Sequence, residues 1–161
     1  MTKKQTFFFP CAAIVLLAFF IGILPVKAAS DIRYASLRNQ QTNLRSGPGE
    51  KYPIEWVLTR KKMPVKVVRK FDVWRQIELI DGDKGWVHQH LLSGLRTALV
   101  DEELLDIHAK PRTDSKILLR LEAGVVVKLD QCVKEWCSIE ISGYEGWAKA
   151  SSLWGNTSED D

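Results

Sequence analysis

The sequence contains nearly the same pattern twice, about sixty residues apart. The segment Asn-Leu-Arg-Ser-Gly-Pro at 43–48 corresponds to the segment at 106–111, which lies 63 residues later. The offset then falls to 62 between Trp74 and Trp136, and after that to 61 for the Gly-Trp pairs. Because loops tolerate changes of length that paired strands do not, each slip is predicted to fall in a turn. The pattern therefore predicts two copies of one small module.

The first 28 residues have the order of a secretory signal. Lys3 and Lys4 precede an apolar run from 7 to 24, and the small residues of Val-Lys-Ala at 26–28 suit a signal peptidase. We therefore expect residues 1–28 to be a signal peptide and the rest of the chain to be periplasmic or secreted, with no stable membrane span. The alternative is an uncleaved membrane anchor, because the apolar run is nearly long enough to cross a bilayer.

The charge of the chain argues against a nucleic-acid-binding protein. The sequence has 23 Lys and Arg against 20 Asp and Glu, and the three excess cations, Lys3, Lys4 and Lys27, all lie in the leader. The remaining chain is neutral, whereas a nucleic-acid binder needs a basic stripe. The balance is uneven, however, since residues 29–94 carry a net charge of +5 and residues after 94 carry −5. The two copies can attract each other, or one can face an acidic polymer.

Short runs of β-branched and aromatic residues alternate with turn residues, and helical periodicity is almost absent. These runs recur in both copies, at 65–68, 74–80, 85–87, 125–129, 137–141 and 146–148. About five short strands in roughly 60 residues suit a small barrel. A module of that size buries only about 60% of its chain surface, so each copy gains stability by docking on the other.

The first copy resembles the bacterial SH3-like domains of exported proteins. The resemblance lies in Asn-Leu-Arg-Ser-Gly-Pro-Gly at 43–49, Trp-x-x-Ile from Trp74, and Gly-Trp-Val-His-Gln-His-Leu-Leu at 85–92. The second copy keeps the pattern with more departures, among them Lys110 and Arg112 at the positions of two glycines.

Together with the repeat, the resemblance implies an all-β chain of two tandem small SH3-like β-barrels after the signal peptide. We expect the first module at 30–94 and the second at 95–155. A disordered acidic tail is expected at 156–161.

The resemblance also implies binding rather than catalysis, with a peptidoglycan peptide or an envelope protein segment as the ligand. It implies that a tryptophan at the start of the strand lines a peptide groove between two loops. The candidate ligand-binding residues are therefore Trp74, the facing Arg45, Glu50 and Tyr52, and Trp136 in the second copy.

Strand alternation places Ile77 toward the core and directs Trp74 and Trp136 outward. An outward tryptophan either anchors a ligand or is covered by a loop or by the neighbouring module. The second alternative corresponds to a structural adaptor whose barrels dock on each other and on a partner protein. Trp86 and Trp147, each of which follows a glycine, are expected in the barrel core.

Cys132 and Cys137 are expected to form a disulfide in an oxidising compartment. A bridge around so short a loop contributes about 2 kcal/mol and fixes a turn. The spacing is not that of a redox-active Cys-x-x-Cys motif, and the first copy has Lys70 and Arg75 at these positions.

No catalytic residue, metal or cofactor is expected. The sequence has no Gly-rich phosphate loop, no nucleophile elbow and no His-Glu-x-x-His motif. His88 and His90 alternate on a strand and could share a metal ion, but no third ligand is placed near them. We therefore interpret both as structural or surface histidines.

Overall fold

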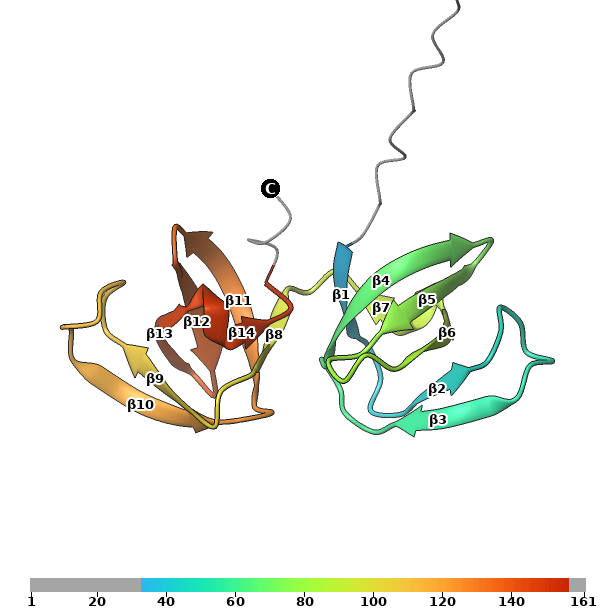
Figure 1. Cartoon of the computed structure of the whole chain (residues 1–161), viewed down its shortest axis with the longest axis horizontal. Coiled ribbons are helices and arrows are strands. Elements are labelled where there is room, and N and C mark those ends of the chain that lie inside the picture. Colours follow the sequence, from blue (N-terminus) through green and yellow to red (C-terminus); the bar gives the residue numbers. More distant parts are fainter. Residues whose placement is uncertain (1–32, 157–161) are drawn as a thin grey trace, which may run out of the picture.

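The computed structural model describes residues 33–156, which form two all-β modules (Figure 1). The strands of the first module are β1 (Arg33–Leu37), β2 (Thr42–Arg45), β3 (Ile54–Leu58), β4 (Pro64–Phe71), β5 (Trp74–Glu78), β6 (Lys84–His88) and β7 (Leu92–Ser93), with the 3-10 helix η1 (Gln89–Leu91) before β7. Those of the second module are β8 (Thr97–Val100), β9 (Leu104–His108), β10 (Ile117–Glu122), β11 (Val126–Val133), β12 (Trp136–Ile141), β13 (Tyr144–Lys149) and β14 (Leu153–Trp154), with η2 (Ala150–Ser152) before β14.

The two sheets have the same strand order. The first sheet runs β3-β2-β6-β5-β4-β1-β7 and the second runs β10-β9-β13-β12-β11-β8-β14, so each strand of the second sheet takes the place of the strand seven earlier. The predicted fold class, an all-β chain built from two copies of one module, is confirmed. The predicted signal peptide at 1–28 and residues 157–161 of the predicted tail lie outside the described residues.

Both one-residue slips of the repeat fall in loops. The first lies between β3 and β4, where Lys62 (φ 64°) occupies the turn position that Gly124 (φ 78°) holds in the second module. The second lies between β5 and β6, where a turn closed by the Leu79 N–H on the Asp83 carbonyl (2.9 Å) replaces a two-residue turn at 142–143. Both residues of that shorter turn have positive φ, as tight hairpins require.

Each module has its own apolar core. The first contains Leu37, Leu44, Val65, Val67, Ile77, Leu79, Val87 and Leu92. The second contains Ala98, Val100, Leu105, Ile107, Leu121, Val127, Leu129, Cys137, Ile139, Ala148, Ala150 and Leu153. The alternating valines of β4 and the inward Ile77 follow from the period of two along a strand.

In β6 and in β13, the glycine that directly precedes the tryptophan allows close packing between strands. A Cβ at Gly85 would lie 2.4 Å from Cγ of Leu44, and one at Gly146 would lie 2.5 Å from Cγ2 of Ile107. Any other residue here would collide with a fully buried side chain, so β6 and β13 can cross the core only with glycine at this point.

Cys132 and Cys137 form the expected disulfide. They lie directly opposite each other on β11 and β12, with their Cα atoms 4.0 Å apart. Lys70 and Arg75 form the opposed pair in the corresponding hairpin of the first module. The bridge therefore fixes one hairpin end, as the short sequence separation predicts.

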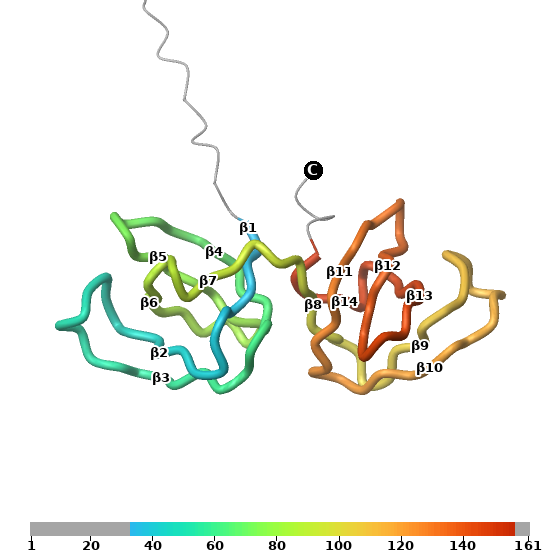
Figure 2. Tube along the Cα trace, turned by 180° about the vertical axis from the view of Figure 1, so that it is seen from behind, coloured from blue at the N-terminus to red at the C-terminus, as the bar shows by residue number. Residues whose placement is uncertain are grey.

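The two modules contact each other directly. Arg60 donates from Nη1 to the Gly124 carbonyl at 2.6 Å. The β3–β4 loop and the β10–β11 loop, where the repeat offset first changes, therefore meet at the interface. Thr97 donates from Oγ1 to the Lys62 carbonyl at 2.9 Å. Figure 2 shows from behind how the segment from β7 to β8 runs from one module to the other.

Aromatic and charged groups add to this interface. The rings of Tyr34 on β1 and Trp154 on β14 meet edge to face with centroids 5.4 Å apart. The hydrogen bond and charge of Lys128 lower the pKa of the Glu140 carboxyl, and Lys62 of the first module lowers it further. The modules are therefore joined by aromatic packing as well as by hydrogen bonds.

The second module extends one residue further than expected. Asn156, which we expected to begin the tail, is buried and donates from Nδ2 to the carbonyls of Ala150 and Leu153, both at 2.6 Å. The amide side chain satisfies carbonyl groups around η2 and β14, and this holds Asn156 in the module.

The Tyr34–Trp154 contact provides a test of docking in solution. We expect Tyr34→Ala and Trp154→Ala each to lower the free energy of unfolding, and the double variant to lose less than the sum. The coupling should be about 0.5–1.5 kcal/mol, the range for an aromatic pair. Urea unfolding of the four proteins measures it, and a coupling of zero would show that the modules separate in solution.

Candidate functional site

A hollow of about 380 Å³ lies on the first module where β2 and its following loop face β5, β6 and η1. It is lined by Gln41, Thr42, Asn43, Arg45, Glu50, Trp74, His88, His90 and Leu91. The structure thus brings together three of the five predicted binding residues, Arg45, Glu50 and Trp74. Trp74 is half-buried, so part of its indole is open to the hollow.

Arg45 holds the loop that forms one side of the hollow. Its Nη1 donates to the carbonyls of Glu50 at 3.0 Å and Tyr52 at 2.7 Å. One charged side chain therefore satisfies two loop carbonyls and fixes the path of residues 46–53. The guanidinium remains a positive charge at the wall of the hollow.

Tyr52 supports the loop rather than lining the hollow. Its ring lies against the loop glycines, because a Cβ at Gly47 would lie 2.4 Å from Cδ1 of Tyr52 and one at Gly49 would lie 3.3 Å from Cδ2. In the second module Ser115 stands at the position of Tyr52. The ring that requires the glycines is absent there, which explains how that copy accommodates Lys110 and Arg112.

Two histidines that sequence reasoning left outside the site line the hollow beside Trp74. His88 lies opposite Trp74 across β5 and β6, with ring centroids 5.5 Å apart. The His88 and His90 rings are 4.1 Å apart, and Nδ1 of His88 accepts from the His90 backbone N–H at 3.3 Å. Trp74 and His88 pair across two neighbouring strands, and this pairing could have identified the histidines as part of the site.

The floor of the hollow includes a buried hydroxyl group. Thr42 is only 1% exposed, and its Oγ1 makes no hydrogen bond with any residue of the described chain. A buried hydroxyl is normally paired, so this unpaired atom is unusual, but the oxygen itself is buried and a ligand in the hollow does not reach it in this conformation. Residues 33–156 contain no group of three or more His, Cys, Asp or Glu side chains placed to hold a metal ion.

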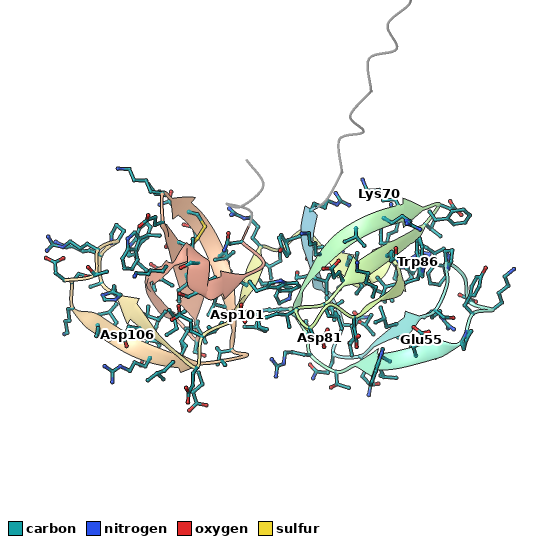
Figure 3. All side chains as sticks on the ribbon, viewed as in Figure 1. Glu55, Lys70, Asp81, Trp86, Asp101 and Asp106 are labelled. Atoms are coloured by element: carbon teal, nitrogen blue, oxygen red, sulfur yellow. A yellow bond between two sulfur atoms is a disulfide. The ribbon has the colours of Figure 1, made fainter. Side chains whose placement is uncertain are left out.

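The second module has a hollow at the same place, with a volume of about 350 Å³. It is lined by Glu102, Leu104, Leu105, Asp106, His108, Thr113, Ile117, Lys149 and Ser152. His108 stands where the first module has Arg45, and Lys149 stands where it has His88. Figure 3 labels Asp106 on this module. The scaffold of the hollow is therefore kept while its chemistry changes.

Trp136 is covered and not open to a ligand, which is the second of the two alternatives for an outward tryptophan. Trp136 is 9% exposed and does not line the hollow, because the His108 ring packs edge to face against it with centroids 5.3 Å apart. The imidazole is held in place by its own loop, with Nδ1 3.2 Å from the Ser115 carbonyl oxygen. Of the tryptophans expected in the core, Trp86 is buried and Trp147 is half-buried.

The cover over Trp136 can be removed by substitution. We expect His108→Ala to expose the Trp136 indole, because the ring that covers it is lost while β12 stays paired with β13. Labelling with 5-fluorotryptophan and recording ¹⁹F spectra in H₂O and D₂O measures exposure at each tryptophan. The Trp136 signal should acquire the solvent isotope shift of an exposed ring while the Trp86 signal stays unchanged. An unaltered Trp136 signal would mean that other groups bury it.

Comparison with known proteins identifies the module. The family model described as bacterial SH3 domain matches residues 39–94 and again residues 102–155, one match in each sheet. No curated protein matches this sequence.

Two solved structures are similar in part. NlpC2 from Trichomonas vaginalis is 13% identical in sequence, with a TM-score of 0.37. The match covers 83% of this chain and 52% of the NlpC2 chain. NlpC1 from the same organism is 14% identical in sequence, with a TM-score of 0.36. The match covers 78% of this chain and 46% of the NlpC1 chain. This chain therefore spans about half the length of either protein. Because the two family matches fall on the two sheets and together cover more than half of the sequence, the chain belongs to the bacterial SH3 domain family and contains two tandem domains of it.

Proposed function

We propose that this protein is an exported, non-catalytic binding protein of the bacterial envelope. Its first domain holds a peptide-bearing wall polymer or a protein segment in the hollow lined by Arg45, Glu50 and Trp74. Bacterial SH3 domains are typically binding modules for the cell wall and are usually extracellular or periplasmic. The predicted signal peptide at 1–28 supports export, with an uncleaved membrane anchor as the alternative. The described chain, 33–156, has no helix with the length and apolar character needed to cross a membrane.

The observation that carries this proposal is the half-buried Trp74 at the edge of a polar hollow. An aromatic ring that is partly desolvated gains free energy when a ligand covers the rest of it. Arg45 and Tyr52 hold the facing loop in one conformation, so little ordering is required on binding. The second hollow lacks this feature, because His108 already covers the equivalent indole.

Retention on purified peptidoglycan tests the proposal. We expect the wild-type protein to be retained and Trp74→Ala to bind at least about 30-fold more weakly, as expected for an aromatic binding anchor. Trp56→Ala is the matched control, since Trp56 is 57% exposed on β3 and does not line the hollow. Equal retention of both variants would place the contact elsewhere, and no retention of the wild type would exclude the wall as the ligand.

A second candidate function, a structural adaptor, is favoured by the edge of the first sheet. β3 is the end strand of that sheet, so the outer edge of its backbone is unpaired within residues 33–156. Ile54, Trp56 and Val57 on this strand are 45%, 57% and 52% exposed. An open edge with exposed apolar side chains fits an extended segment of a partner protein that pairs with it as an added strand.

Site-specific photocrosslinking in cells separates this adaptor role from wall binding. A benzoylphenylalanine at Val57 should give one discrete crosslinked product if an extended partner strand lies on β3. The same group at Tyr144, which is 66% exposed in the β12–β13 hairpin of the second domain, is the control and should give none. The adaptor role is contradicted if Val57 and Tyr144 give the same pattern.

A further inference from the structure

A row of planar polar side chains runs along one side of the hollow in the first domain. Gln41, Asn43 and Arg45 all line the hollow. The two residues between them are buried, so the period of two along a strand places the three polar side chains on one face. Among residues 33–156, the amide groups of Gln41 and Asn43 form no hydrogen bond, and Arg45 uses only Nη1. This polar row therefore offers a ligand amide donors, amide acceptors and guanidinium donors.

Aromatic side chains form a second row, across three strands of the same domain. Phe71 on β4 lies directly opposite Trp74 on β5, and Trp74 lies directly opposite His88 on β6. Directly opposed residues share a face of the sheet, and neighbouring strands lie about 4.8 Å apart, so this aromatic row spans about 10 Å. Phe71 is 59% exposed. The aromatic row therefore extends the apolar surface of the hollow beyond Trp74, to a ring that is open to solvent.

The polar row and the aromatic row together suit a sugar better than a peptide. A pyranose ring has a face of C–H groups, which packs on the negative face of an aromatic ring, and an edge of hydroxyl groups, which needs both donors and acceptors. An aromatic row of about 10 Å has room for two linked rings. An extended peptide needs apolar pockets for its side chains, whereas Leu91 is the single aliphatic residue that lines the hollow.

The second domain has other residues in place of both rows. Leu104 and Asp106 stand where the first domain has its two amide side chains, and Asp106 is paired with Arg120 at 2.7 Å. Val133 stands where the first domain has its exposed phenylalanine, directly opposite the buried Trp136. In the part of the chain that the structure describes, the amide groups and the open aromatic row therefore belong to the first domain only.

We propose that the first domain binds the glycan chain of the wall polymer, which is built from β-linked N-acetylated sugars. Trp74 and Phe71 lie against the C–H faces of neighbouring sugar rings, and Gln41 and Asn43 form hydrogen bonds with the acetamido and hydroxyl groups. The inference rests on the proposed function, since it takes the hollow to be the binding site. It names the sugar, and not the attached peptide, as the part of the polymer that is recognised.

Two matched oligosaccharides test sugar recognition. The β-1,4-linked tetramer of N-acetylglucosamine is titrated into protein labelled with 5-fluorotryptophan, alongside cellotetraose, which has hydroxyl groups in place of the acetamido groups. The ¹⁹F signal of Trp74 reports binding in this hollow. We expect the N-acetylated tetramer to bind about threefold to tenfold more tightly than cellotetraose, the effect of one additional hydrogen-bonded group. Equal binding of the two tetramers, or an unchanged Trp74 signal with both, would overturn the proposal.

Exchanges between the two domains identify the residues responsible. Phe71→Val and Gln41→Leu introduce residues that the second domain already carries at the same positions, so both variants should fold. We expect Phe71→Val to bind the N-acetylated tetramer about threefold to tenfold more weakly and single N-acetylglucosamine equally well, because one ring covers Trp74 alone. Gln41→Leu should reduce the preference over cellotetraose, and Val133→Ala in the second domain is the control without effect. An equal loss for the tetramer and the single sugar in Phe71→Val would overturn the contact of Phe71 with the glycan.

Retention on two forms of peptidoglycan separates this inference from the proposed function. Intact peptidoglycan is compared with the same material after an amidase has removed its peptides. We expect the wild-type protein to be retained on both forms. Retention on the intact form alone would overturn glycan recognition and leave the proposed function standing, with the peptide as the ligand. Retention on neither form would overturn the wall as the ligand, while binding of the N-acetylated tetramer at Trp74 would still support recognition of the sugar.

Discussion

Each domain depends on a strand backbone that lies directly on a buried aliphatic side chain. Gly85 on Leu44 and Gly146 on Ile107 allow this contact, and any Cβ would prevent it. The contact aligns the residue after Leu44 with β6, so that Arg45 pairs with Trp86. Two residues later His88 reaches the hollow opposite Trp74. The core contact therefore decides which side chains meet at the surface, and the rest of the site follows from strand pairing.

The sequence was sufficient for the parts of the structure that follow from local rules. Strand alternation predicted the buried Ile77, and the changes in repeat offset predicted the loops of unequal length. The exposure of Trp136 could not be predicted in this way, because alternation gives the face of a sheet and not what covers that face. The residue that covers Trp136 is His108, which lies on a strand far from Trp136 in the sequence. Tyr52 was placed in the correct loop, but only the packing of its ring against Gly47 shows that it supports the loop.

The differences between the copies occur in groups that are related physically. Where Tyr52 is replaced by Ser115, the glycines beneath the ring are replaced as well. Where Arg45 is replaced by His108, the neighbouring indole becomes covered. The core and the strand order stay the same in both copies. A duplicated scaffold can thus change the chemistry of one hollow without loss of the fold, since the residues that change are not those that form the core.

The contacts of Arg60 with Gly124 and of Tyr34 with Trp154 bear on how a long polymer would be held. Domains joined by a loose linker reach many separations, whereas docked domains keep their two hollows at one distance. A polymer whose repeating units match that distance would meet the second hollow at an effective concentration in the millimolar range. A polymer with another spacing would engage one hollow at a time. For a polymer that binds both hollows, docking would make the spacing of its repeating units, and not only its chemical groups, a determinant of avidity.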